Sequence, residues 1–200
     1  MTGWQSVAMR TVAMRIAAVL FFAPAWWPAA AADVVSPKAG VCEVCHGMGG
    51  NSTNPAVPSL AGQPQQFITT QLVMFREGNR KNAEMSPFAA NLSNADLREL
   101  AAYFSAQPLA PLARTLTADK AAAGKSLTQQ YFCVNCHGQA LRGQMHIPRL
   151  AGQQTEYLRV QLRGFKASTR FDMDGQMSSA AQPLTLADID VLAEYLSALQ

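Results

Sequence analysis

Cys42-Glu43-Val44-Cys45-His46 and Cys133-Val134-Asn135-Cys136-His137 are two copies of one motif, Cys-x-x-Cys-His. Together they contain all four cysteines and two of the three histidines of this 200-residue chain. Two thiols at this spacing can each add across a vinyl group of one porphyrin, and the histidine that follows then lies beside the iron. The motifs therefore predict two covalently bound c-type haems, with His46 and His137 each filling one axial position of an iron.

Four cysteines could also form disulfides, a zinc site or a thioredoxin-like dithiol, and a lone Cys-x-x-Cys would leave all three open. The histidine that directly follows each motif argues against each of these uses. A zinc site would also need a second dithiol or a histidine pair, and His146 is the only spare histidine. We interpret His146 as a solvated loop residue rather than a haem ligand or a catalytic group.

The first 32 residues are typical of a secretory signal peptide. Arg10 and Arg15 precede the apolar run Ile16 to Phe22, and the small residues Ala29 to Ala32 offer a cleavage site before Asp33. A retained membrane anchor is the alternative, but the apolar run is interrupted by prolines and is short for a span of about 20 residues. We expect cleavage after Ala32 and a periplasmic mature protein.

The mature chain is nearly neutral. Without Arg10 and Arg15 it carries 14 basic and 13 acidic side chains, and no basic block remains. The propionates of two haems would make the holoprotein mildly acidic. We therefore expect no nucleic-acid partner.

The chain also repeats itself. Pro58-Ser59-Leu60-Ala61-Gly62-Gln63 recurs ninety positions later as Pro148-Arg149-Leu150-Ala151-Gly152-Gln153, and the two haem motifs are ninety-one positions apart. A proline-containing segment without a helical charge pattern separates the two copies. The repeat predicts a signal peptide over residues 1–32, a first domain over 33–107, a linker over 108–116 and a second domain over 117–200.

Each repeat has the pattern of an all-α domain. Apolar residues from Phe67 to Phe75 and from Tyr157 to Phe165 recur at helical spacing, and no alternating strand pattern is convincing. Capping boxes with a short acid open a final amphipathic helix in each repeat, and a further helix precedes the second motif only. The final helices begin at Ser93-Asn94-Ala95-Asp96 and Thr185-Leu186-Ala187-Asp188 and end near Ala106 and Ala198, and the further helix runs from Ala118 to about Phe132.

Methionine is the candidate for the second axial position of each iron. Of the six methionines that follow the leader, only Met85 and Met177 form a pair when the repeats are aligned, 39 and 40 residues after His46 and His137. We therefore predict Met85 and Met177 as axial ligands. Core filling is the commoner role of methionine and our interpretation of Met74, and the unmatched Met173 is the competing ligand.

The remaining methionines, Met48 and Met145, have no counterpart in the other repeat, so we assign them to packing or loops. Pro58 and Pro148 follow the two ligating histidines by twelve and eleven residues. A backbone carbonyl there could accept the free imidazole N–H and fix the orientation of the ring. Turn formation alone would also explain a proline at this position.

With the two haem motifs, the repeated Pro-x-Leu-Ala-Gly-Gln stretch and the paired methionines, the chain resembles the dihaem cytochrome c4 family over nearly all of residues 38 to 200. The resemblance implies two tandem class I cytochrome c domains with closely approaching haems. It also implies His/Met ligation of both irons, by His46 with Met85 and by His137 with Met177. The chain departs from the family in its short segment before Cys42, where a counterpart of Gly124 is missing.

The expected function is that of an electron carrier rather than an enzyme. It would pass single electrons from a respiratory donor complex to a terminal oxidase or another acceptor, with peripheral membrane association only through such partners. One alternative is the cytochrome subunit of a membrane-associated dehydrogenase. Another is a dihaem redox enzyme in which one haem has an open site.

Overall fold

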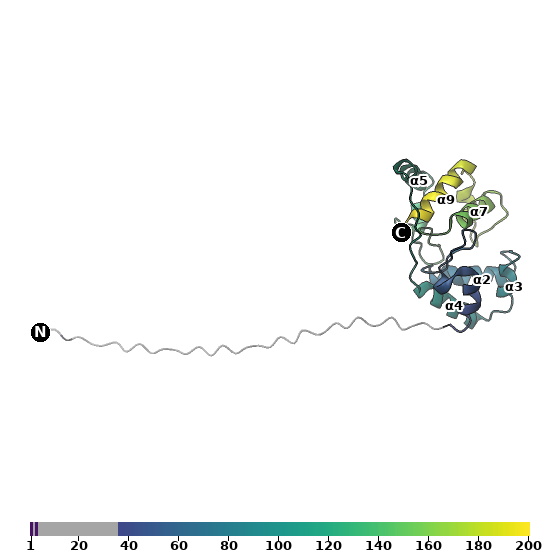
Figure 1. Cartoon of the computed structure of the whole chain (residues 1–200), viewed down its shortest axis with the longest axis horizontal. Helices are drawn as coiled ribbons and strands as arrows, with labels where there is room; N and C mark the ends of the chain where they lie inside the picture. The colour runs from purple at the N-terminus through teal and green to yellow at the C-terminus, as the bar shows by residue number, and fades with distance from the viewer. Residues whose placement is uncertain (2, 4–35) are drawn as a thin grey trace. The chain divides into compact units, whose positions relative to one another are not determined.

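A computed structural model describes residues 1, 3 and 36–200 of the chain (Figure 1). The signal peptide and its cleavage after Ala32 lie outside the described residues. Within those residues the regular structure is helical, apart from an isolated bridge between Gln144 and Ile147. None of the helices described is long and apolar enough to cross a membrane.

Among the described residues, the first helix of the first repeat is the one that carries the first haem motif. This helix, α1, is followed by a short 3-10 segment, η1, and by α2, α3 and α4. Their bounds are Ala39–His46 for α1, Met48–Gly50 for η1, Gln65–Arg76 for α2, Met85–Ala89 for α3 and Asn94–Ala106 for α4. The predicted helix from Phe67 to Phe75 is confirmed and extends slightly at both ends.

The second repeat has an additional helix, α5, before its haem motif. The motif itself forms α6, and α7, α8 and α9 repeat the pattern of α2, α3 and α4. The bounds are Ala118–Gln130 for α5, Cys133–His137 for α6, Thr155–Lys166 for α7, Gln176–Ala181 for α8 and Leu186–Ala198 for α9. The predicted helix that starts at Ala118 is confirmed, and it ends two residues before Phe132.

Both final helices begin where the capping boxes place them. The Ser93 hydroxyl accepts from the backbone N–H of Asp96, whose carboxylate accepts from the N–H of Ser93, and Thr185 and Asp188 make the same pair of bonds. Each box satisfies two backbone donors that the first helical turn leaves free. A hydrogen bond from Lys38, followed by those from Ser93, lowers the pKa of Asp96 to about 2.

Each repeat has its own hydrophobic core. In the first, α4 supplies Leu100, Ala101 and Phe104, which pack with Ile68 of α2 and with Ala39. The core of the second repeat is larger, because α9 packs against both α5 and α7 there, as Figure 1 shows. Its buried members are Leu141, Ala151, Leu158, Phe165, Ala181, Leu184, Ile189, Leu192, Ala193 and Leu196.

The contact between α5 and α9 depends on Gly124. A Cβ atom at this position would lie 2.2 Å from the Cβ atom of Tyr195, so the two helices cross with no room for a side chain. Lys120 of α5 also forms an ion pair with Glu194 of α9, with a distance of 2.7 Å. Gly124 is thus the position at which α5 and α9 approach most tightly.

We expect Gly124→Ala to destabilise the second repeat by about 1–3 kcal/mol, because the added methyl group must force α5 away from α9. Thermal unfolding of the holoprotein, followed by circular dichroism, measures the effect. Gly40→Ala in α1 is the matched control, since a Cβ atom there meets nothing within 4 Å. Equal melting temperatures for the two variants would contradict the packing argument.

Candidate functional site

The two Cys-x-x-Cys-His motifs lie on short helices at equivalent places in the two repeats. Cys42 and Cys133 are partly buried, Cys45 and Cys136 are exposed, and none of the four forms a disulfide. Burial raises the pKa of Cys42 and of Cys133. The thiols of redox-active dithiols have the opposite property, a lowered pKa.

Both motif histidines are buried and held by a proline carbonyl. His46 is 4% exposed and His137 is 7% exposed. The Nδ1 atom of His46 lies 2.8 Å from the carbonyl oxygen of Pro58, and that of His137 lies 2.8 Å from the carbonyl oxygen of Pro148. The predicted role of these two carbonyls is confirmed.

This contact fixes the protonation of each ring. A carbonyl oxygen can only accept a hydrogen bond, so Nδ1 carries the proton and the lone pair lies on Nε2. Burial lowers the pKa of His46 and of His137, and the hydrogen bond to the proline carbonyl offsets this only in part. Both imidazoles are therefore neutral and keep Nε2 available for a metal, as axial ligation requires.

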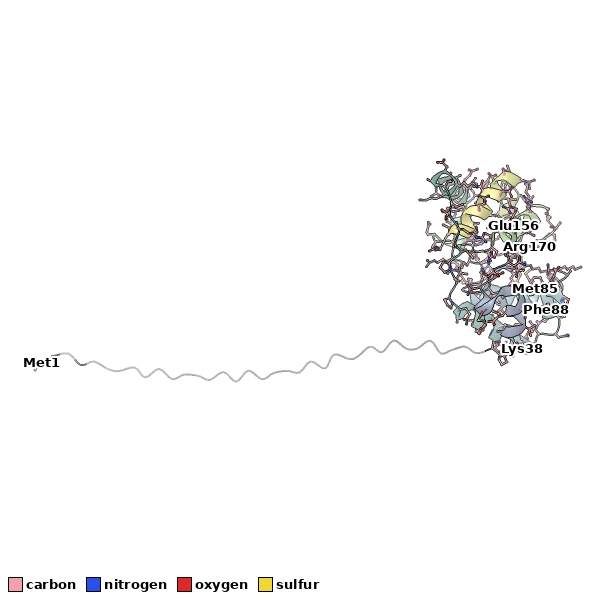
Figure 2. All side chains as sticks on the ribbon, in the orientation of Figure 1. Met1, Lys38, Met85, Phe88, Glu156 and Arg170 are labelled. Carbon is pink, nitrogen blue, oxygen red and sulfur yellow. The ribbon has the colours of Figure 1, made fainter. Side chains whose placement is uncertain are left out.

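Met85 and Met177 lie at the start of equivalent short helices. The backbone N–H of Met85 donates to Asn82 Oδ1 over 2.7 Å, and that of Met177 donates to Asp172 Oδ2 over 2.8 Å. Polar side chains thus hold each methionine from the preceding loop. Figure 2 labels Met85 on α3, one helical turn before Phe88. The role of both methionines as iron ligands stays a prediction.

Burial separates these two methionines from the others in the described part of the chain. Met85 and Met177 are partly buried. Met74 is buried in the first repeat, as its predicted core role requires. Met48, Met145 and the competing ligand Met173 are exposed by 66% or more.

His146 lies in the loop that follows the second motif, as predicted. Its Nε2 atom is 3.8 Å from a carboxylate oxygen of Asp174, and both side chains are about half exposed. A contact at this distance and exposure contributes little to stability. The contact joins the loop after α6 to the loop before α8.

The structure also brings together two arginines that sequence analysis did not select. Arg80 donates to Gln71 Oε1 of its own repeat over 2.6 Å and to Gln161 Oε1 of the second repeat over 3.0 Å. Arg170 makes the equivalent two bonds from the second repeat. It donates to Gln161 of its own repeat and, over 3.5 Å, to Gln71 of the first repeat. Figure 2 labels Arg170 between Glu156 of the second repeat and Met85 of the first.

Each of the two guanidinium groups stacks on an aromatic ring of its own repeat. The guanidinium carbon of Arg80 lies 4.5 Å from the centre of the Phe75 ring, and that of Arg170 lies 4.4 Å from the centre of the Phe165 ring. Such stacking fixes the plane of each guanidinium group. Arginine recurs at the same ninety-residue interval as the Pro-x-Leu-Ala-Gly-Gln stretch, and this was the signal that could have identified the pair.

The arginine pair lacks sufficient acceptors among the described residues. Arg170 Nε is buried without a hydrogen-bond partner, and burial lowers the pKa of Arg170 to about 10. Burial would raise the pKa of Tyr157, but the charges of Arg80 and Arg170 outweigh it, so the pKa of this phenol lies below its usual value. Two cations and an unpaired donor fit an acidic oxygen group, and the propionates of a haem have this chemistry.

Comparisons with known proteins match both repeats to cytochromes c. A family model described as cytochrome c matches residues 121–200, and one described as cytochrome c oxidase, cbb3-type, subunit III matches residues 30–104. Cytochrome c4 of Thiocapsa roseopersicina is 36% identical over 86% of this chain and 96% of its own length. A thiosulfate dehydrogenase electron acceptor of Thiomonas intermedia (strain K12) is also 36% identical, over 97% of this chain and 93% of its own.

Solved structures give the same result for the fold. Reduced recombinant cytochrome c4 from Pseudomonas stutzeri superimposes with a TM-score of 0.75 at 32% identity, covering 82% of this chain and 95% of its own. A thiosulfate dehydrogenase from Marichromatium purpuratum has a TM-score of 0.70 at 30% identity. That match covers 80% of this chain but only 36% of the larger protein.

We expect Arg170→Met to lower the midpoint potential of at least one haem, because loss of a cation favours the ferric form. One unit charge about 10 Å away contributes about 1–2 kcal/mol at an effective dielectric constant of about 20. Redox titration of the holoprotein measures the shift. Arg163→Met is the control, since Arg163 is exposed and pairs with Asp190 on the surface. Unchanged potentials in Arg170→Met would show that the arginine pair does not face a haem.

Proposed function

The chain belongs to the dihaem cytochrome c4 family and binds two c-type haems covalently, and we propose that it carries single electrons in the periplasm from a respiratory donor complex to a terminal oxidase or another acceptor. The observation that carries this proposal is the same histidine-to-proline contact, at 2.8 Å, in both repeats. Neither repeat has altered this contact, as expected if both haems share one task.

Each repeat supplies one complete set of attachment and ligand residues. We propose that Cys42 and Cys45 bind the first haem, with His46 and Met85 as its axial ligands. The second set is Cys133, Cys136, His137 and Met177. The neutral, oriented imidazoles and the partial burial of both methionines support this assignment. We further propose the domain boundaries given by the repeat, with residues 1–32 as a cleaved leader.

Haem iron supplies reversible one-electron transfer when bound. The chain contributes orientation and electrostatics. Pro58 and Pro148 hold the histidine rings, while Asn82 and Asp172 hold the backbone of the methionine helices. Ligands held in this way need not move when an electron arrives or leaves. This favours a carrier, and we propose that the protein is not an enzyme.

A cytochrome subunit of a membrane-associated dehydrogenase is the second candidate. Relatives from Thiomonas intermedia and Stutzerimonas stutzeri that are called thiosulfate dehydrogenase electron acceptors favour it. Purification of the tagged protein from its native membranes and periplasm distinguishes the two candidates. A dehydrogenase recovered at equal stoichiometry favours the subunit, whereas recovery of the cytochrome alone favours a mobile carrier.

The assigned ligands predict that the reduced holoprotein does not bind carbon monoxide, because sulfur occupies the sixth position of each iron. Met85→Ala should open one haem and Met177→Ala the other, so each variant should bind one equivalent of carbon monoxide. Absorption spectra of the dithionite-reduced proteins measure this binding.

Met173→Ala is the matched control, since Met173 is exposed and lies four positions before Met177. It should leave the spectrum unchanged. Carbon monoxide binding by the unaltered protein would favour a dihaem redox enzyme with one open site. Binding by Met173→Ala instead of Met177→Ala would move the ligand assignment to Met173.

A further inference from the structure

The peptide group that holds His46 is also contacted by a glutamine of the other repeat. The carbonyl of Pro58, which accepts from His46, and the N–H of Ser59 belong to one peptide group. This N–H donates to Gln153 Oε1 over 2.8 Å. The Nε2 atom of Gln153 in turn donates to the carbonyl oxygen of Ser59 over 2.9 Å.

The second repeat has the mirror arrangement. The peptide group between Pro148 and Arg149 accepts from His137 through its carbonyl and donates through its N–H to Gln63 Oε1 over 3.0 Å. The Nε2 atom of Gln63 donates to the carbonyl oxygen of Arg149, also over 3.0 Å. The contacts are thus crossed, since each glutamine contacts the peptide that orients the histidine of the opposite repeat.

Both glutamine amides are fixed in place. Gln63 is 3% exposed and Gln153 is 4% exposed, and each forms two hydrogen bonds to one backbone segment. The N–H donor and the carbonyl acceptor on that segment determine which amide atom is oxygen and which is nitrogen. Water therefore does not compete for the N–H of Ser59 or of Arg149, both of which are occupied.

Hydrogen bonds that share a peptide group strengthen one another. A peptide whose N–H donates has a more negative carbonyl oxygen, and in a buried setting this effect is larger than in water. Such an oxygen attracts the Nδ1 proton of the histidine more strongly and makes Nε2 more electron-rich. An electron-rich axial imidazole stabilises ferric iron and lowers the midpoint potential.

We propose that Gln153 is a positioning residue for His46 and that Gln63 is a positioning residue for His137, so that each repeat adjusts the midpoint potential of the haem bound by the other. The proposal rests on the proposed function, because it takes His46 and His137 as haem ligands. The potential of either haem then depends on how the two repeats are docked.

Gln153→Met and Gln63→Met test the proposal in the holoprotein. Each removes both glutamine bonds while keeping a side chain of similar length. Gln153→Met should raise the midpoint potential of the haem bound by His46 and leave that of the other haem unchanged, and Gln63→Met should do the reverse. Redox titration followed by proton NMR resolves the two haems, whose signals are assigned with Met85→Ala and Met177→Ala.

Gln154→Met is the matched control for the alternative that the glutamines only stabilise the contact between the repeats. Gln154 is 1% exposed, and its side chain donates across the interface to the carbonyl oxygen of Ser52. It should lower stability without a shift in potential that is specific to one haem. If Gln153→Met yields too little holoprotein, Gln153→Asn keeps a buried amide that is one methylene too short, and the same crossed rise is expected.

The outcomes separate the proposal from the function on which it rests. Unchanged potentials, equal shifts of both haems, or a shift of the haem in the variant's own repeat would overturn the crossed coupling. The haem content and the spectrum of the unaltered protein are measured first. An unaltered protein without two histidine-ligated haems would overturn the proposed function itself.

Discussion

The hydrogen bond from each motif histidine to a proline carbonyl is the constraint on which both sites depend. It sets the tautomer of the imidazole and directs Nε2 away from the backbone, and it requires the Pro-x-Leu-Ala-Gly-Gln segment to lie beside the motif helix. The peptide that accepts this bond is buried, so its N–H also needs a partner. The glutamine of the other repeat is that partner, and the orientation of each motif histidine is therefore linked to the contact between the repeats.

Local signals made much of the fold predictable from sequence. The capping boxes at Ser93 and Thr185 fix where α4 and α9 begin, because both halves of each box lie within four residues. The helical periodicity of α2 and α7 was predictable for a similar reason, because it too is a pattern within one short segment. The histidine-to-proline contacts were predictable because both partners recur in the repeats at nearly the same separation.

The arginine pair and the crossed glutamines were not predictable in this way. Arg80, Arg170, Gln63 and Gln153 all recur at the ninety-residue interval, which marks them as a set. Their partners lie in the opposite repeat, however, and periodicity within one repeat carries no information about how two repeats dock. The predicted axial methionines, Met85 and Met177, are an intermediate case. Alignment of the repeats selects them from the sequence, but their predicted bond is to iron and not to another residue of the chain.

The crossed contacts have the form of a two-fold symmetric dimer, in which residue i of one subunit meets residue j of the other and j meets i. Gln63 with Arg149 and Gln153 with Ser59 are such a pair of contacts, and so are Arg80 with Gln161 and Arg170 with Gln71. A homodimer must use identical residues at symmetric positions, whereas a fused chain can change one copy alone. Two equivalent positions of the repeats show such changes. Ser59 of the first repeat corresponds to Arg149 of the second, and Phe67 corresponds to Tyr157. Fusion thus lets the two halves of one symmetric interface carry different side chains.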